Sequence, residues 1–246
     1  MAGTIARSIG LAALLACFAL AAMADPGYYV VTAYDEAGVR SLDLRYWTVK
    51  FGGSPVRTWP EVGLSYGVNH RWTTALLLSY IGDSASPTTL SSFNWQNDYL
   101  LTQGQYPVDV AVHTQLIHEN NAGSAHTLEW GPALQTDIGR TQLNANLFFE
   151  QRFGGDTHKP TLMKYQWQIR HRWMPALHLG LQGFGEVGTW DDWSPHRRQS
   201  HRTGPALFSN VELAPGQMLK IQGAYLMGKI YGRQGSMFSM RAALSF

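Results

Sequence analysis

Most of the chain consists of segments in which apolar and polar residues alternate one by one. In one of them Leu143, Ala145 and Leu147 alternate with Asn144 and Asn146. A β-strand turns successive side chains to opposite faces, so each such segment has one apolar and one polar face. No window of helical length shows a convincing 3.6-residue period. The pattern therefore predicts an all-β protein.

The alternating segments predict strands, and their connections predict how the strands are arranged. The strands are expected at 40–50, 57–69, 71–81, 92–101, 107–118, 126–138, 141–152, 161–172, 176–188, 204–213, 217–228 and 236–246. Tight connections such as 69–70 and 139–140 alternate with longer ones such as 82–91, 189–203 and 229–235. Short periplasmic turns and longer external loops are typical of transmembrane β-barrels. We therefore predict a closed antiparallel transmembrane barrel of about 12 strands.

The N-terminus predicts export from the cytoplasm. Residues 1–24 combine a positively charged start, an apolar run and a small-x-small sequence ending at Ala24, as in a cleaved secretory signal peptide. A lipobox at Cys17 is the alternative interpretation. Cleavage leaves a chain without cysteine, which excludes a disulfide scaffold, and no later apolar run reaches the roughly 18 residues of a membrane helix. We expect 25–39 to be a periplasmic segment, within which 28–34 is either a short strand or is tucked into the lumen, and 40–246 to be the barrel.

The C-terminal strand ends in an aromatic residue, Phe246. Phe238 and Met240 lie on its apolar face, whereas Ser239 and Arg241 lie on the other. This ending resembles the assembly signal that the barrel-assembly machinery recognises on bacterial outer-membrane barrels. The resemblance implies the outer membrane of a Gram-negative bacterium as the location, with outer-membrane lipid and lipopolysaccharide as partners.

Aromatic residues gather near the expected strand ends. In a transmembrane barrel such rings mark the two membrane–water boundaries. The residues are Phe51, Trp59, Trp72, Tyr80, Phe93, Tyr106, Phe153, Trp173, Trp190, Tyr231 and Phe246. The alternative is a soluble periplasmic barrel of the lipocalin type, in which the apolar face would point inward and the polar face outward.

One hairpin resembles a known group of barrels. Residues 60–72 form an expected strand, turn and strand, and 139–146 has a similar composition. The unit is similar to a hairpin common in proteobacterial outer-membrane barrels of the MetA-pathway phenol-degradation, transporter-like family. The resemblance covers the expected barrel loosely and implies a channel for small, often aromatic, compounds. It assigns no functional residue.

Motifs that usually indicate catalysis or cofactor binding are interpreted here as strand residues. The G-x-S-x-G match at 63–67 places Ser65 inside an expected strand, whereas a hydrolase nucleophile needs a strand-to-helix turn. The G-x-G-x-x-G match at 183–188 lacks the βαβ unit that binds a dinucleotide, and its glycines are expected to mark a bend or a crowded neighbour. The histidines show no metal-ligand spacing. We expect no catalytic residue, cofactor, metal or nucleic-acid partner, and an outer-membrane lipid-modifying enzyme is the less favoured alternative.

The polar strand faces are expected to line the lumen. Their charged and imidazole side chains are Asp43, Arg45, Glu61, Asp98, Asp109, His113, Glu129, Asp137, Glu150, Lys164, Arg170, His178, Glu186, Glu212, Lys220 and Arg241. Acidic residues outnumber basic ones, which predicts a pore that disfavours anions. Opposite charges on neighbouring strands are expected to pair, and barrel closure is expected to bring Arg241 beside Asp43 and Arg45.

The expected loop 189–203 is basic and aromatic. Arg197, Arg198 and Arg202 are candidates for contact with lipopolysaccharide, because guanidinium forks suit phosphates. A solvated loop without a specific ligand is the alternative.

The sequence thus favours a monomeric outer-membrane barrel that acts as a narrow channel or passive transporter for a small-molecule solute. The main alternative is a non-conducting structural or assembly-partner barrel, since lumen charges that pair with one another are satisfied without conducting anything.

Overall fold

The computed structural model describes residues 28–32, 37–120, 125–154, 159–230 and 232–246. The expected signal peptide at 1–24 and Tyr231 lie outside these ranges. Among the residues described, no helix is both long and apolar enough to cross a membrane.

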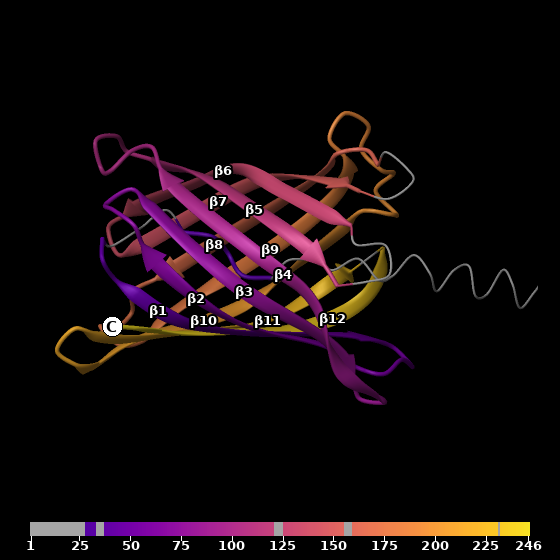
Figure 1. Ribbon diagram of the computed structural model, residues 1–246, viewed down its shortest axis with the longest axis horizontal. Helices are drawn as coiled ribbons and strands as arrows, with labels where there is room; N and C mark the ends of the chain where they lie inside the picture. The colour runs from indigo at the N-terminus through magenta and orange to yellow at the C-terminus, as the bar shows by residue number, and fades with distance from the viewer. Residues whose placement is uncertain (1–27, 33–36, 121–124, 155–158, 231) are drawn as a thin grey trace, which may run out of the picture.

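Twelve antiparallel strands close into one barrel (Figure 1), as the alternation predicted. The strands are β1 (Arg40–Phe51), β2 (Arg57–Gly67), β3 (Trp72–Asp83), β4 (Ser86–Leu100), β5 (Asp109–Glu119), β6 (His126–Ile138), β7 (Thr141–Phe153), β8 (Leu162–His171), β9 (His178–Thr189), β10 (Ser200–Ala214), β11 (Gln217–Ile230) and β12 (Arg233–Ser245). Each strand pairs with its neighbours in the chain, and β1 pairs with β12.

Closure of the barrel depends on the two end strands. Arg45 lies opposite Arg241 in the register of β1 and β12. Past the last residue of β12, the Phe246 amide donates to the Arg40 carbonyl at 2.8 Å, and the Arg40 amide donates to the Phe246 carbonyl at 3.1 Å. Both ends of the barrel chain therefore lie at the same end of the barrel.

The alternating polar and apolar residues face the interior and the outer surface of the barrel, respectively. On β7 the side chains of Gln142, Asn144 and Asn146 are buried in the barrel, whereas Leu147 is exposed on the outer surface. The outer surface of the other strands is also apolar, with exposed Leu44, Leu64, Leu76, Trp95, Leu207 and Tyr225. Because a soluble lipocalin-type barrel requires the opposite arrangement, the lipid-facing interpretation of the apolar rows is confirmed.

Three expected connections are shorter than the sequence suggested. The expected loop 82–91 is the tip of a hairpin, because β3 continues to Asp83 and β4 begins at Ser86. The expected loop 189–203 ends at the start of β10, Ser200, and the connection 229–235 is also mostly strand. These residues pair across a hairpin, which polar composition alone does not reveal.

The sequence predicts local distortions at glycines in two strands, β9 and β6. Gly183 and Gly185 on β9 lie opposite Trp167 and Tyr165 on β8, and a Cβ atom at either glycine would collide with the paired ring. The predicted crowded neighbour is therefore confirmed. Proline inside a strand removes a ladder donor, so Pro132 in β6 predicts a bulge at Gly131-Pro132. That prediction is wrong, because β6 keeps its register with both neighbours, although its pairing with β7 is interrupted there.

The aromatic residues divide between the outer surface and the interior. Trp72, Phe93, Tyr106, Phe153, Trp173, Trp190 and Phe246 are exposed, as expected of membrane-boundary rings. Trp59 is not a membrane-boundary ring. It is buried inside the barrel and stacks on Trp47, with 6.5 Å between ring centroids.

Residues 28–31 lie inside the barrel and are buried, rather than outside it as a periplasmic segment. We call them the inner segment. The Ser239 hydroxyl of β12 donates to the Tyr28 carbonyl at 2.5 Å, and Asn146 of β7 donates to the Val31 carbonyl at 2.9 Å. Because β12 and β7 are far apart in the strand order, the inner segment crosses the interior. Of the two alternatives left open for 28–34, the described residues 28–32 follow the tucked one.

Candidate functional site

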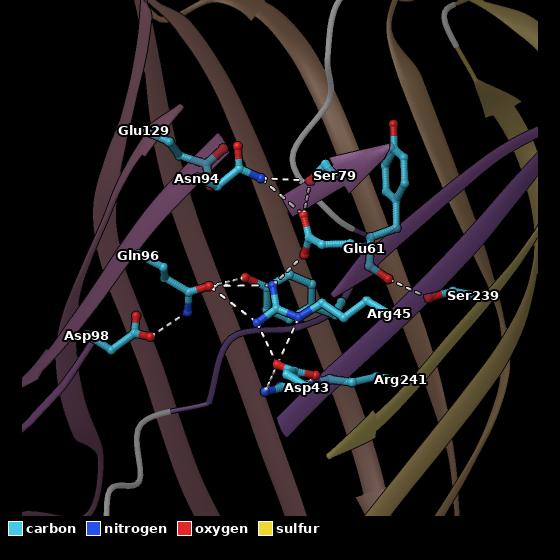
Figure 2. A network of polar contacts seen from close by, with 12 residues as sticks. Asp43, Arg45, Glu61, Ser79, Asn94, Gln96, Asp98, Glu129, Ser239 and Arg241 are labelled. Carbon is cyan, nitrogen blue, oxygen red and sulfur yellow. Dashed lines mark hydrogen bonds and ion pairs between the residues drawn. The ribbon is translucent and has the colours of Figure 1, made fainter. Parts of the chain in front are cut away.

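The barrel interior holds a group of ion pairs around Arg45, which we call the central cluster (Figure 2). Arg45 Nη2 lies 2.8 Å from Asp43 Oδ2, and Arg45 Nη1 lies 3.0 Å from Glu61 Oε1. Arg241 Nη2 lies 2.7 Å from Asp43 Oδ2 across the β1–β12 seam. The four side chains hold two positive and two negative charges, so the cluster has no net charge. The predicted contact of Arg241 with Asp43 is present.

Neutral polar groups complete the central cluster. Glu61 accepts hydrogen bonds from Ser79 and from Asn94 Nδ2, the latter at 3.0 Å. Gln96 Nε2 donates to Asp98 Oδ2 at 2.6 Å (Figure 2). Buried carboxylates are costly unless they are paired and hydrogen-bonded. The contacts from β1, β2, β3, β4 and β12 satisfy that requirement.

The central cluster also fastens the inner segment. The Arg45 guanidinium lies over the Tyr29 ring, 3.8 Å from its centroid. The Tyr29 hydroxyl donates to Gln96 Oε1 at 2.5 Å. Cations over aromatic faces attract the ring electrostatically, and more strongly when they are shielded from water. Tyr29 is thus held on both its face and its hydroxyl.

A second group of charges lies on β4 to β8. Lys164 forms ion pairs with Glu150 and with Glu129, the latter at 3.1 Å. His113 Nδ1 lies 2.6 Å from Asp98 Oδ1, and its Nε2 lies 3.5 Å from Glu129 Oε1. The strand-to-strand pairing expected for Lys164 and Glu150 is present.

Arg202 does not lie in the loop in which the sequence places it. It lies on β10 with its side chain buried in the barrel, not on an external loop. Its Nη2 lies 2.5 Å from Glu186 Oε1, and its guanidinium lies 4.0 Å from the centroid of the Tyr28 ring. The Tyr28 hydroxyl also donates to Glu186, at 3.1 Å. Arg202 therefore holds the inner segment, whereas Arg197 and Arg198 are exposed in the connection before β10.

Part of the interior is apolar, which differs from the polar lumen expected from the sequence. Tyr28 and Val30 of the inner segment pack in a buried cluster with Trp47, Val49, Trp59, Phe184, Ala206, Phe208, Ala224, Leu226, Ile230 and Met237. The signal was present: Trp47 and Val49 share a strand face with Asp43 and Arg45, because all four positions are odd-numbered on β1. Tyr29 and Val31 pack in a second buried cluster, with Leu100, Ala111, Ala133 and Phe148. All four residues of the inner segment are therefore packed among apolar side chains.

The remaining predicted lumen residues lie nearer the end of the barrel that holds the termini. Asp109 is buried and accepts from the Gly104 amide at 2.6 Å, so it stabilises the β4–β5 connection. Asp137 is exposed and pairs with Arg172 at 2.7 Å. Glu212 and Lys220 are exposed near the β10–β11 turn. Asp137 and Glu212 therefore lie at the rim of the barrel and not deep in the lumen, because both are close to the ends of their strands.

A cavity of about 380 Å³ opens at this same end, and we call it the vestibule. Val30 and Thr32, from the inner segment and the residue after it, form part of its lining. Its charged lining residues are Arg170, Arg172, Lys220 and Arg241, with His178 beside them, and none of the described lining residues is acidic. The described lining of the vestibule therefore has the opposite sign to the acidic excess that the sequence suggested for the whole lumen.

Ser65 belongs to the vestibule wall and not to a nucleophile turn. It lies on β2, opposite Ser41 of β1 and Ala75 of β3, and β2 is followed by a turn and another strand. Within the described ranges, no group of three metal-ligating side chains could hold a metal ion.

The fold is similar to those of solved outer-membrane barrels. An outer membrane channel from Pseudomonas putida F1 has a TM-score of 0.60 at 13% identity, and the match covers 91% of this chain and 100% of that one. The KdgM porin in complex with disordered oligogalacturonate has a TM-score of 0.53 at 8% identity, and the match covers 84% of this chain and 98% of that one. The translocator domain of autotransporter NalP from Neisseria meningitidis has a TM-score of 0.52 at 12% identity, and the match covers 98% of this chain and 97% of that one. No family model and no curated protein matches the sequence. At these identities the likeness establishes the barrel fold.

Proposed function

We propose that this protein is a narrow passive channel for small polar solutes in the outer membrane of a Gram-negative bacterium, closed by its inner segment in the conformation described. The observation that carries the proposal is a polar, charged interior that opens as the vestibule at one end and is crossed by residues 28–31. Barrels of about 8 strands are filled by side chains and those of 16–18 hold water, so 12 strands leave room for a narrow passage once an inner segment moves.

The contacts that hold the inner segment in place support its proposed role as a gate. Tyr28 and Tyr29 are held by hydrogen bonds and by cation–π contacts with Arg202 and Arg45, and not by a continuous strand ladder. Each of these contacts stabilises the segment by about 1 kcal/mol or somewhat more. Residues 28–31 are also buried against apolar side chains, but they belong to no strand pair of the barrel. The segment can therefore leave the interior without breaking a strand pair.

The test is conductance in planar lipid bilayers. We expect the wild-type chain to be mostly closed, and the Tyr28→Ala/Tyr29→Ala variant to open for much longer. The matched control is Tyr99→Ala/Tyr225→Ala, which removes two tyrosines from the outer surface. Silence of both the wild type and the inner variant across salts would reject the channel and favour a structural or assembly-partner barrel. Equal conductance of the wild type and the inner variant would reject the gate.

Further features of the proposal concern the surroundings of the barrel. The exposed Arg197 and Arg198 are proposed to contact lipopolysaccharide phosphates, and Phe246 is proposed to be read by the barrel-assembly machinery. Membership of the MetA-pathway family is supported only by the hairpin resemblance. Ser65 is proposed to have no catalytic role, because it lies within β2, paired with β1 and β3, and not on a strand-to-helix turn.

A further inference from the structure

We propose that the vestibule binds small hydroxylated organic anions, such as sugar acids. The inference deepens the proposed channel function by naming a class of solute, and its transport aspect rests on that function. Binding itself requires only the cavity. Its basis is the charge and the hydrogen-bonding chemistry of the vestibule lining.

Two of the four vestibule cations keep an uncompensated charge. Arg241 is paired with Asp43 at 2.7 Å, and Arg172 with Asp137 at 2.7 Å. For Arg170 and Lys220, no ion pair is found within the described part of the chain. The vestibule therefore has a positive field that a small anion can neutralise.

Arg170 is the better positioned of these two cations. It is half-buried on β8, and its Nε donates to His178 Nδ1 at 2.7 Å. His178 Nε2 lies 3.3 Å from the Pro175 carbonyl, so the ring is a neutral imidazole that accepts at Nδ1 and donates at Nε2. The guanidinium also lies 5.2 Å from the centroid of the Phe208 ring. These contacts order Arg170 without neutralising it, and a guanidinium fork can bind a carboxylate through two parallel hydrogen bonds.

The rest of the vestibule lining suits hydroxyl groups better than an apolar body. Amide and hydroxyl side chains are its most numerous kind, and they are Thr32, Ser41, Ser65, Thr73, Gln142, Gln168, Asn210, Gln222 and Ser245. Each can both donate and accept, which matches the hydroxyls of a sugar acid. The volume of about 380 Å³ lies in the usual range for small-molecule sites.

The acidic residues of the interior do not oppose this binding. Asp43 and Glu61 are engaged by Arg45, and Glu129 and Glu150 by Lys164. Each of these four carboxylates has an ion-pair partner in its own cluster, although Lys164 balances only one of the two charges that it contacts. None of these four lines the vestibule. The composition of the polar faces predicted exclusion of anions, whereas the arrangement of the charges favours anions at this end.

The test is isothermal titration calorimetry of the full mature chain in detergent, with gluconate as the probe and glucose as its neutral counterpart. We expect gluconate to bind measurably more tightly than glucose, and to bind more weakly as salt is raised, because screening weakens the attraction. Equal binding of the two sugars, or no gluconate binding, would overturn the inference.

Substitutions then test which residues are responsible. Arg170→Gln and Lys220→Gln should each weaken gluconate binding, by up to about tenfold for a lost charge-assisted contact, and leave glucose unaffected. Lys50→Gln, at the opposite end of β1 and exposed, is the matched control and should change nothing. If Arg170→Gln fails to fold, gluconate binding by Lys220→Gln tests the inference, because Lys220 is exposed. Unchanged gluconate binding in Lys220→Gln would then overturn the inference.

The proposed anion site and the proposed channel can be rejected independently of each other. If the chain binds gluconate but remains silent in bilayers after Tyr28→Ala/Tyr29→Ala, the binding site stands and the channel is rejected. If the variant conducts but gluconate does not bind, the channel stands and the anion site is rejected.

Discussion

Replacing Arg45 with methionine should destabilise the barrel more than any surface change on the same strand. Arg45 is buried and contacts Asp43 at 2.8 Å and Glu61 at 3.0 Å, and it covers the Tyr29 ring. Removing one partner of a buried ion pair costs about 3–5 kcal/mol, because a charge is left without a partner. Asp43 keeps Arg241 and Glu61 keeps Asn94, so we expect a loss near the lower end, about 3 kcal/mol.

The assay is urea unfolding of the barrel in lipid vesicles, followed by tryptophan fluorescence. Lys50→Met on the same strand is the control, because Lys50 is exposed, and surface substitutions usually change the free energy of unfolding by no more than about 0.5 kcal/mol. Adding Glu61→Gln to Arg45→Met should restore about 1–2 kcal/mol, since the carboxylate that lost its cation becomes neutral.

Two results would refute this reasoning. A loss of less than about 1 kcal/mol in Arg45→Met would mean that water reaches the central cluster and screens its charges. Failure of Glu61→Gln to restore any stability would mean that the loss comes from packing against Tyr29 and not from an unpaired carboxylate.

Four other predictions follow from the structure. Leu76→Arg, on the outer surface of β3, should cost about 2–4 kcal/mol in bilayers, measured by vesicle unfolding, and a neutral effect would contradict the lipid-facing assignment. Gly185→Leu should destabilise the barrel by about 1–3 kcal/mol in the same assay, because the added side chain collides with the ring opposite it on β8, and retained stability would reject the crowding argument. Arg197→Ala/Arg198→Ala should weaken lipopolysaccharide binding in a pull-down assay, with unchanged capture as the opposing result. Deletion of Phe246 should reduce insertion into the outer membrane, measured by heat-modifiable migration on gels, and full insertion would remove it as an assembly signal.

The strand pattern could be predicted because it is a local property. The rows on β7 and β8, such as Asn144 and Gln168 inside against Leu143 and Ile169 outside, follow from the two-residue period alone. The contact between Asp43 and Arg241 was also predictable, because closing an even number of antiparallel strands places the first beside the last. Composition was a poorer guide to where strands end: the polar residues 86–91 read as a loop but continue β4 to Ser86.

Sequence alone therefore determined that this chain forms a closed antiparallel barrel with lipid outside and charge inside, since each strand carries its own two faces. The tertiary structure decided what occupies that interior. Tyr28 contacts Arg202, and Tyr29 contacts Gln96. Both partners are far away in the sequence, so no local pattern predicts these contacts. The sign of the vestibule is likewise a result of the fold, because it depends on which cations keep a carboxylate partner after the barrel has closed.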